Sequence, residues 1–276
     1  MIIDSFMFGS ELDILEGRLE YLNPVVDKFI LVESNLTHSG NTKPLHFAEN
    51  IKRYKKYLHK IHYLPFMTNR EDYNFDRLPT HDRDYDTGPW QLENAQRNHI
   101  AVAFEGYNAD DILLLSDLDE IPHRTCIDIT RDYFSKGYYA LAVEHDYHAY
   151  NFRTKHQSPW VGTAITTLKY AQERGPQGIR NERHGYGHIT NGGWHLTWWG
   201  TVADIQNKIS SFSHQETNQE RFKDPNYIIE HMKTGKDIFD RDIPVIEVDS
   251  TTIPEDVFRI FGSYSQQLIE STQDNV

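Results

Sequence analysis

Three carboxylates follow directly after an apolar run in the segment DILLLSDLDEIP, residues 111–122. Asp117, Asp119 and Glu120 are so close in the chain that they repel one another unless they are solvated, protonated or neutralised by a cation. Asp117 and Asp119 lie on the same side of an extended segment. Carboxylate oxygens suit Mg²⁺ and Mn²⁺. The spacing indicates a divalent-metal site, but an acidic loop in which Asp119 or Glu120 caps the next helix would show the same residues.

The elements that must position this triplet alternate along the first half of the chain. Short apolar runs predict strands, and apolar residues at helical spacing between them predict helices. The strands are residues 2–8, 25–32, 61–66 and 112–115, and the helices are residues 12–22, 51–58, 90–104 and 123–136. This order predicts a mostly parallel sheet covered by helices. Ligands bind such sheets at the carboxyl ends of the strands, where the acidic triplet stands.

The second half of the chain has a different pattern. Three strands are predicted over residues 138–152, 163–169 and 194–199, and the first two could pair antiparallel. Helices are predicted after them over residues 202–212, 227–232 and 254–268. Thr201 can cap the first of these helices. Since no linker rich in Pro, Gly or Ser separates the halves, one continuous domain is predicted.

Composition excludes several classes of protein. The chain of 276 residues has 28 Lys and Arg against 41 Asp and Glu, a formal net charge of −13. This charge repels phosphate backbones and anionic lipid, so neither nucleic acid nor a membrane surface is an expected partner. The chain shows no apolar run of roughly 18 residues and no signal peptide, which predicts a cytoplasmic protein without a membrane span. The single cysteine, Cys126, excludes an intramolecular disulfide and fits a reducing compartment.

Six segments resemble successive motifs of glycosyltransferase family 17, a family that includes enzymes adding GlcNAc to N-glycans. They occur in family order across about residues 5–241 and are ELDILEGRL (11–19), LVESNLTHSGNTKPLHF (31–47), DDILLLSDLDEIP (110–122), NGGWHLTWWG (191–200), KISSFSHQETN (208–218) and GKDIFDR (235–241). The resemblance is far more specific than the acidic triplet alone.

The resemblance implies an inverting, metal-dependent transferase of the GT-A fold, an α/β fold with a mostly parallel central sheet flanked by helices. Such an enzyme moves a sugar from a UDP-sugar, UDP-GlcNAc by analogy, to a glycan hydroxyl and forms a β-linkage. Asp119 would bind Mn²⁺ or Mg²⁺ at the donor diphosphate, and Asp117 would bind the metal or the ribose. The single domain, residues 1–276, would comprise a nucleotide-sugar half (1–125), an acceptor and catalytic half (126–245) and a C-terminal extension (246–276).

An inverting transfer requires a base that takes the proton of the acceptor hydroxyl. Glu216 is the favoured candidate because it lies in the family-like segment FSHQE, just past a predicted helix, where no structural role is visible. Glu120 and Asp204 are further candidates. Glu120 could instead hold the metal loop in place, and helix capping with Thr201 would explain Asp204 equally well.

Five residues are candidates for binding the donor. Glu33 ends the second predicted strand, where it could accept hydrogen bonds from uracil or ribose, and Glu93 and Arg97 form an i,i+4 pair on a predicted helix. A net-acidic protein must supply local cations to hold a diphosphate, and Lys43, Arg97 and Arg180 are the candidates. Each of the two glutamates could equally be a solvated cap or a surface ion pair.

Histidine and tryptophan residues stand in the best-matching segments. His195 is a candidate metal ligand, and His214 could bind the metal or a phosphate. Trp194, Trp198 and Trp199 could form a sugar platform, although alternation along a strand favours a packing role for two of them.

Two other functions remain open from the sequence. A glycoside hydrolase could use Asp119 and Glu216 as its two carboxylates, without nucleotide or metal. A carbohydrate-binding protein or a degenerate transferase would use the aromatic residues for recognition alone. The absence of a predicted membrane anchor favours a bacterial or viral enzyme that builds a surface glycan from cytosolic nucleotide sugar.

Overall fold

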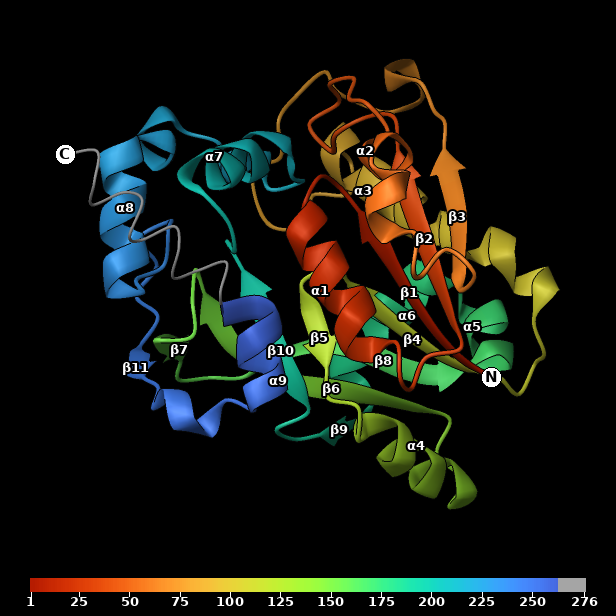
Figure 1. The fold of residues 1–276 in the computed structure, drawn as a ribbon. Coiled ribbons are helices and arrows are strands. Elements are labelled where there is room, and N and C mark those ends of the chain that lie inside the picture. The colour runs from red at the N-terminus through yellow and green to blue at the C-terminus, as the bar shows by residue number, and fades with distance from the viewer. Residues whose placement is uncertain (263–276) are drawn as a thin grey trace.

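The computed structural model describes residues 1–262, which form a central sheet flanked by helices (Figure 1). Within these residues the sheet has nine strands in the order β3-β2-β1-β4-β8-β6-β10-β5, with β9 paired to β6. The strands are β1 (Ile2–Phe8), β2 (Lys28–Ser34), β3 (Ile61–Phe66), β4 (Ile112–Asp117), β5 (Glu120–Pro122), β6 (Ala140–Ala149), β8 (Trp160–Thr167), β9 (Gly187–Ile189) and β10 (Gly193–Thr197). The α/β class with a mostly parallel sheet, expected from the sequence, is confirmed.

Strand register brings three carboxyl ends to one edge of the sheet. β1 pairs in parallel with both β2 and β4, so that Phe8 is opposite Glu33 and Met7 is opposite Asp117. β8 runs antiparallel to β4 and β6, which confirms the antiparallel pairing expected in the second half of the chain. The acidic loop therefore begins beside the end of β1, and β2 ends on the other side of β1.

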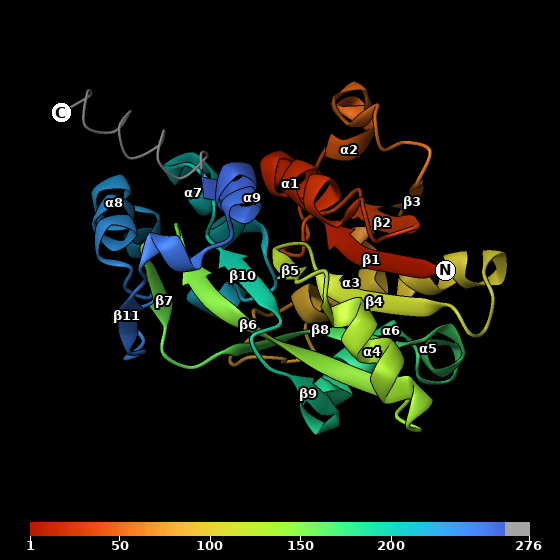
Figure 2. The same cartoon turned by 60° about the horizontal axis from the view of Figure 1, so that its bottom comes forward.

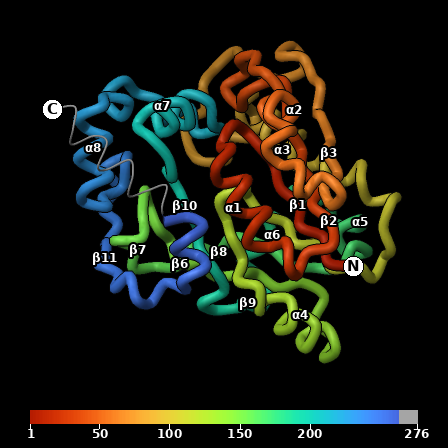
Figure 3. The backbone as a smooth tube through the Cα atoms, viewed as in Figure 1, coloured from red at the N-terminus to blue at the C-terminus, as the bar shows by residue number. Residues whose placement is uncertain are grey.

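The helices cover both faces of the sheet. They are α1 (Leu12–Leu22), α2 (His46–Glu49), α3 (Gly88–Asn98), α4 (Cys126–Ser135), α5 (Leu168–Arg174), α6 (Pro176–Glu182), α7 (Val202–Ser211), α8 (Pro225–Thr234) and α9 (Glu255–Val257). Two short strands, β7 (Thr154–His156) and β11 (Val245–Glu247), form a separate ribbon. Figure 3 shows this ribbon and α8 at one side of the molecule, with β2 and β3 at the other.

Two apolar clusters hold the layers together. One packs Leu15 and Leu19 of α1 and Ile127 of α4 with residues of the sheet. The other packs Leu168 of α5 and Ile179 of α6 with strand residues that point the opposite way. Adjacent strand residues alternate between the two clusters, because successive side chains of a strand point to opposite faces. Figure 2 allows α1 and α6 to be followed on either side of β1 and β4.

Three predicted helices differ from the structure. The helix predicted over 51–58 is only a 3-10 turn at Ile51–Tyr54, because Ile51 is 40% exposed and no continuous apolar stripe forms; α2 lies just before it. The helix over 90–104 is α3 followed by a 3-10 helix, and Val102 is exposed. At the C-terminal end, α9 leads into a π turn over Phe258–Gly262, and the rest of the predicted helix lies outside the described residues.

Several predicted strands also have shifted ends; those predicted over 138–152 and 163–169 are β6 and β8, and α5 begins at Leu168. The strand predicted over 25–32 is β2, which begins only at Lys28. It begins later because the chain still turns at Val26, whose N–H donates to the carbonyl of Leu22. β10 ends at Thr197 because Trp198 has a left-handed backbone with φ of 56°. Across the described residues, no helix is both long and apolar enough to cross a membrane.

Candidate active site

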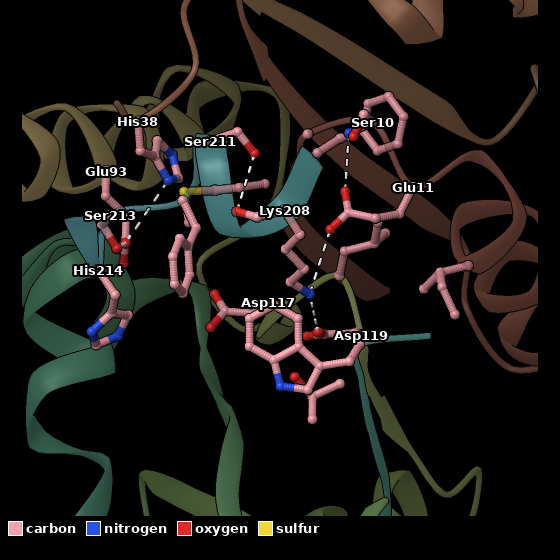
Figure 4. Close-up of a pocket in the computed structure, with 18 of the residues that line it drawn as sticks. Ser10, Glu11, His38, Glu93, Asp117, Asp119, Lys208, Ser211, Ser213 and His214 are labelled. Atoms are coloured by element: carbon pink, nitrogen blue, oxygen red, sulfur yellow. Dashed lines mark hydrogen bonds and ion pairs between the residues drawn. The ribbon is translucent and has the colours of Figure 1, made fainter. Parts of the chain in front are cut away.

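A cavity of about 1190 Å³ opens at the carboxyl ends of β1 and β4 (Figure 4). Its wall comes from the ends of both strands, the start of α1, one side of α3 and the segment from β10 to Thr217. Side chains of Ser10, Glu11, His38, Glu93, Asp117, Asp119, Lys208, Ser211, Ser213 and His214 lie around it. Its place agrees with the position expected for a ligand in a sheet of this type.

Asp117 ends β4 between two buried arginines. Its Oδ1 accepts from Arg97 Nη2 at 3.0 Å, and its Oδ2 accepts from Arg180 Nη2 at 2.5 Å. Removal from water raises the pKa of this carboxyl, but Arg180 and Arg97 outweigh that effect and hold the pKa well below its usual range. Asp117 is therefore ionised and orders both guanidinium groups at the cavity wall.

Asp119 makes a different set of contacts. Its Oδ2 accepts from Lys208 Nζ at 2.8 Å, and its Oδ1 lies 3.7 Å from His195 Nδ1. Burial raises the pKa of Asp119, but Lys208 and His195 hold it below its ordinary value. Burial also lowers the pKa of His195, against the pull of Asp119, so the ring is neutral near pH 7.

Two donors in this cavity fit a divalent metal ion. Among residues 1–262 there is no group of three or more His, Cys, Asp or Glu side chains that could hold a metal. Mg²⁺ commonly takes only one or two protein ligands, with water and substrate phosphates completing its shell. His195 Nδ1 is buried and has no hydrogen-bond partner within the described residues, and Asp119 stands beside it. These two residues fit such an ion, whereas both oxygens of Asp117 are engaged by arginines.

Glu120 is not placed as a base. Its side chain has no exposed surface, and its oxygens accept from Arg180 at 2.7 and 2.9 Å, from Trp160 Nε1 at 2.6 Å and from the N–H of Asp117 at 2.9 Å. A carboxylate that is enclosed and already bonded in this way cannot reach an acceptor hydroxyl. Glu120 instead holds the acidic loop in place.

Arg18 of α1 also holds the acidic loop in place. The sequence analysis did not identify this residue. Arg18 Nη1 donates to the carbonyls of Asp117, Leu118 and Glu120 at 3.3, 3.1 and 2.5 Å. Its Nη2 lies 2.6 Å from Asp4 Oδ1, and neither of these two side chains is exposed. A signal was available, because Arg18 lies on the leucine-bearing face of α1, three residues after Leu15, and Asp4 interrupts an apolar strand.

Two further candidates have structural partners instead. Asp204 Oδ2 accepts from the N–H and the hydroxyl of Thr201 at 2.8 and 2.7 Å, and this capping box starts α7. The carboxylate of Glu33 accepts from Phe47 N–H, Lys43 Nζ and the Tyr63 hydroxyl, and the side chain is fully buried. The Glu33 carboxylate is enclosed by these partners, whereas Asp204 caps α7 through Oδ2 and lines the cavity.

Lys43, Glu93 and Arg97 all reach the cavity wall. The predicted pair of Glu93 and Arg97 is confirmed, with 2.9 Å between Oε1 and Nη2. The other oxygen of Glu93 accepts from the Ser213 hydroxyl and so ties α3 to the segment after α7. Burial lowers the pKa of Lys43 despite its contact with Glu33.

Glu216 lines the cavity together with His214, a pairing that the sequence analysis did not anticipate. The distance between His214 Nδ1 and Glu216 Oε1 is 2.8 Å. Glu216 Oε2 is buried and lacks a hydrogen-bond partner among residues 1–262. The His214 and Trp90 rings pack in a T-shaped arrangement, with 4.7 Å between their centroids. The Glu216 carboxylate therefore orients the His214 ring at the cavity wall, where Nε2 lies 3.9 Å from Asp82 Oδ1.

The tryptophans divide between the cavity and the core. Trp198 and Trp199 line the cavity, although both are largely buried, and Trp194 packs edge-on against Tyr21. Trp160, which the sequence analysis did not single out, lines the cavity and stacks on His195 with 4.8 Å between ring centroids. This stacking fixes the plane of the His195 ring.

A sheet flanked by helices, with a large cavity at the carboxyl ends of its strands, defines the class of α/β proteins that bind ligands at that edge of the sheet. The chain matches the model of glycosyltransferase family 17 over residues 1–245. It therefore belongs to glycosyltransferase family 17, as the motifs indicated.

The curated relatives include the β-1,4-mannosyl-glycoprotein 4-β-N-acetylglucosaminyltransferases of rat and human. Each is 25% identical over 272 residues, an alignment that covers 85% of this chain and 47% and 48% of the rat and human proteins. The chain thus spans about half the length of these relatives. The mammalian source of these relatives does not support the bacterial or viral origin expected from the sequence.

Among solved structures, the chain is similar to 4-diphosphocytidyl-2C-methyl-D-erythritol synthase from Anaerococcus prevotii. The sequences are 12% identical, the TM-score is 0.38, and the match covers 68% of this chain and 86% of that one.

Proposed function

We propose that this chain transfers GlcNAc from UDP-GlcNAc to a glycan hydroxyl with inversion, forming a β-linkage. The observation that carries the proposal is the set of cations around the acidic loop. Arg97 and Arg180 flank Asp117, and Lys208 contacts Asp119, all in the wall of one cavity. In a chain with a net charge of −13, such a cluster favours a ligand that carries negative charge at one end, such as a nucleoside diphosphate sugar.

The donor would place its diphosphate against these cations. The paired carboxylate of Asp117 holds both guanidinium groups in position before the donor arrives, which lowers the entropic cost of binding. A divalent ion held by Asp119 and His195 would supply Lewis-acid stabilisation of the charge that develops on departing UDP.

His214 and Glu216 would activate the acceptor. The acceptor hydroxyl passes its proton to His214 Nε2, while its oxygen bonds to the anomeric carbon and the bond from that carbon to the UDP oxygen breaks. Glu216 accepts a hydrogen bond from the Nδ1–H of His214 and stabilises the imidazolium that forms when Nε2 takes the proton. The proposed base is thus the pair, and Glu216 acts through His214.

Calorimetric titration with UDP and UDP-GlcNAc tests the donor, each with Mn²⁺ and with EDTA. We expect both ligands to bind, and more tightly with Mn²⁺. Release of UDP in the presence of N-glycan acceptors then tests transfer. Glycan binding without any nucleotide binding would support a carbohydrate-binding protein, and glycan hydrolysis that EDTA does not affect would support a glycoside hydrolase. Either result would overturn the proposal.

A further inference from the structure

Lys208 places an ammonium group at the carboxylate that the proposed metal would use. Lys208 lies on α7, and its side chain points between Asp119 and Glu11 (Figure 4). Its Nζ is 2.8 Å from Asp119 Oδ2 and 3.6 Å from Glu11 Oε1. Only 25% of the Lys208 side chain and 12% of the Asp119 side chain are exposed, so water screens the contact weakly.

An ammonium and a divalent cation cannot share this carboxylate without repelling each other at close range. Binding of the ion at Asp119 therefore requires Lys208 to weaken its contact or to leave it. The structure contains the alternative partner, because Glu11 already faces the same nitrogen. The second oxygen of Glu11, Oε2, accepts from the N–H of Ser10 at 2.9 Å, which holds the carboxylate at the cavity wall.

We propose that Lys208 is a built-in competitor of the divalent cation at Asp119, and that Glu11 receives its ammonium group when the cation binds. The inference rests on the metal site of the proposed function. The free protein keeps Asp119 neutralised and ordered by Lys208. A divalent ion displaces that ammonium group by a short movement of one side chain toward Glu11.

Electron paramagnetic resonance of Mn²⁺ added to the metal-free protein measures this competition without any turnover. We expect Lys208→Gln to bind Mn²⁺ about tenfold more tightly than the unmodified chain, because the competing charge is gone. Lys208→Arg keeps the charge and is expected to leave Mn²⁺ affinity at or below that of the unmodified chain. Glu11→Gln is expected to weaken Mn²⁺ binding, since Lys208 then has Asp119 alone as its carboxylate partner.

Matched variants separate this effect from net charge and from misfolding. Lys136→Gln removes a lysine from the exposed surface beyond α4, where it pairs with Asp132, and is expected to leave Mn²⁺ affinity unchanged. Asp119→Asn combined with Lys208→Gln is expected to abolish the gain in affinity. Circular dichroism and thermal unfolding verify that each variant is folded, and Lys208→Arg tests the same position with its charge retained.

Two outcomes would overturn the inference: Mn²⁺ binding to folded Lys208→Gln that is equal to or weaker than binding to the unmodified chain, or no Mn²⁺ binding to either protein. UDP titration of the same samples keeps the two proposals apart. If UDP binds but Lys208→Gln does not change Mn²⁺ affinity, the competition is refuted while the donor site stands. If Mn²⁺ affinity rises but UDP does not bind, the competition stands and the proposed function fails.

Discussion

Arg18 and Asp4 form an ion pair whose side chains have no exposed surface, with 2.6 Å between Nη2 and Oδ1. The same guanidinium donates to three carbonyls of the acidic loop, those of Asp117, Leu118 and Glu120. Asp4 neutralises Arg18, and Arg18 determines where the loop after β4 lies. This relationship joins the first strand and first helix of the chain to its candidate active site.

Arg18→Met is expected to destabilise the protein by about 3–5 kcal/mol, because it leaves the Asp4 carboxylate buried without a partner. Chemical unfolding in urea measures this loss. Asp4→Leu combined with Arg18→Met should recover most of the stability, since an apolar pair replaces the ion pair. UDP binding should be weaker in both variants than in the unmodified chain, because the loop carbonyls lack their donor in each. Normal UDP binding by the double variant would show that Arg18 does not position the loop.

Asp119→Asn and Asp117→Asn are expected to differ. Asp119→Asn should weaken binding of UDP with Mn²⁺ by about tenfold or more and change stability little. Asp117→Asn should also lower the free energy of unfolding, since it weakens contacts to two buried arginines, Arg97 and Arg180. Calorimetry and urea unfolding provide the two readouts, with Asp128→Asn on the exposed side of α4 as control. Equal effects of both changes on stability would contradict these assignments.

His214→Ala is expected to lower kcat by about 10²–10⁴-fold, because a positioned base contributes a factor of that size. UDP affinity should stay within about twofold, since the histidine is proposed to act on the acceptor. Glu216→Gln should lower kcat less than His214→Ala, because it removes the partner of the base and leaves the ring. Initial rates and UDP titrations measure both effects, and His188→Ala is a suitable control, because this exposed histidine also pairs with a carboxylate. A loss of UDP affinity equal to the loss of kcat would argue for a donor-binding role instead.

Stability is expected to fall as the pH drops from about 6.5 to 4. Burial lowers the pKa of His148 from 6.5 to about 4, despite contacts with Thr154 and Asp146. In that pH window the unfolded chain binds a proton that the folded chain excludes, so lower pH favours unfolding. His148 alone accounts for about 3 kcal/mol across the window. Urea unfolding of His148→Gln should show a correspondingly smaller loss, and an unchanged pH dependence would refute the assignment.

The local part of the site could be predicted from the sequence. An apolar run that ends in Asp117, Asp119 and Glu120 predicts a buried strand followed by an acidic loop, because strand formation depends on neighbouring side chains. Thr201 and Asp204 predict the start of α7 for the same reason, since a capping box involves residues three apart. Family motifs added the class of protein, which no spacing alone could supply.

The roles of the individual carboxylates depended on partners that are distant in the chain. Arg180 is 63 positions from Asp117, Lys208 is 89 positions from Asp119, and Arg18 is 102 positions from Glu120. Propensity and periodicity depend only on residues that are close together in the chain. They therefore determined the order of strands and helices, and with it a mostly parallel sheet with an acidic loop at a strand end. The tertiary structure decided which acidic side chain pairs with an arginine, which faces a lysine and which remains available at the cavity. Burial gives such pairings their strength, and burial exists only once the layers have packed together.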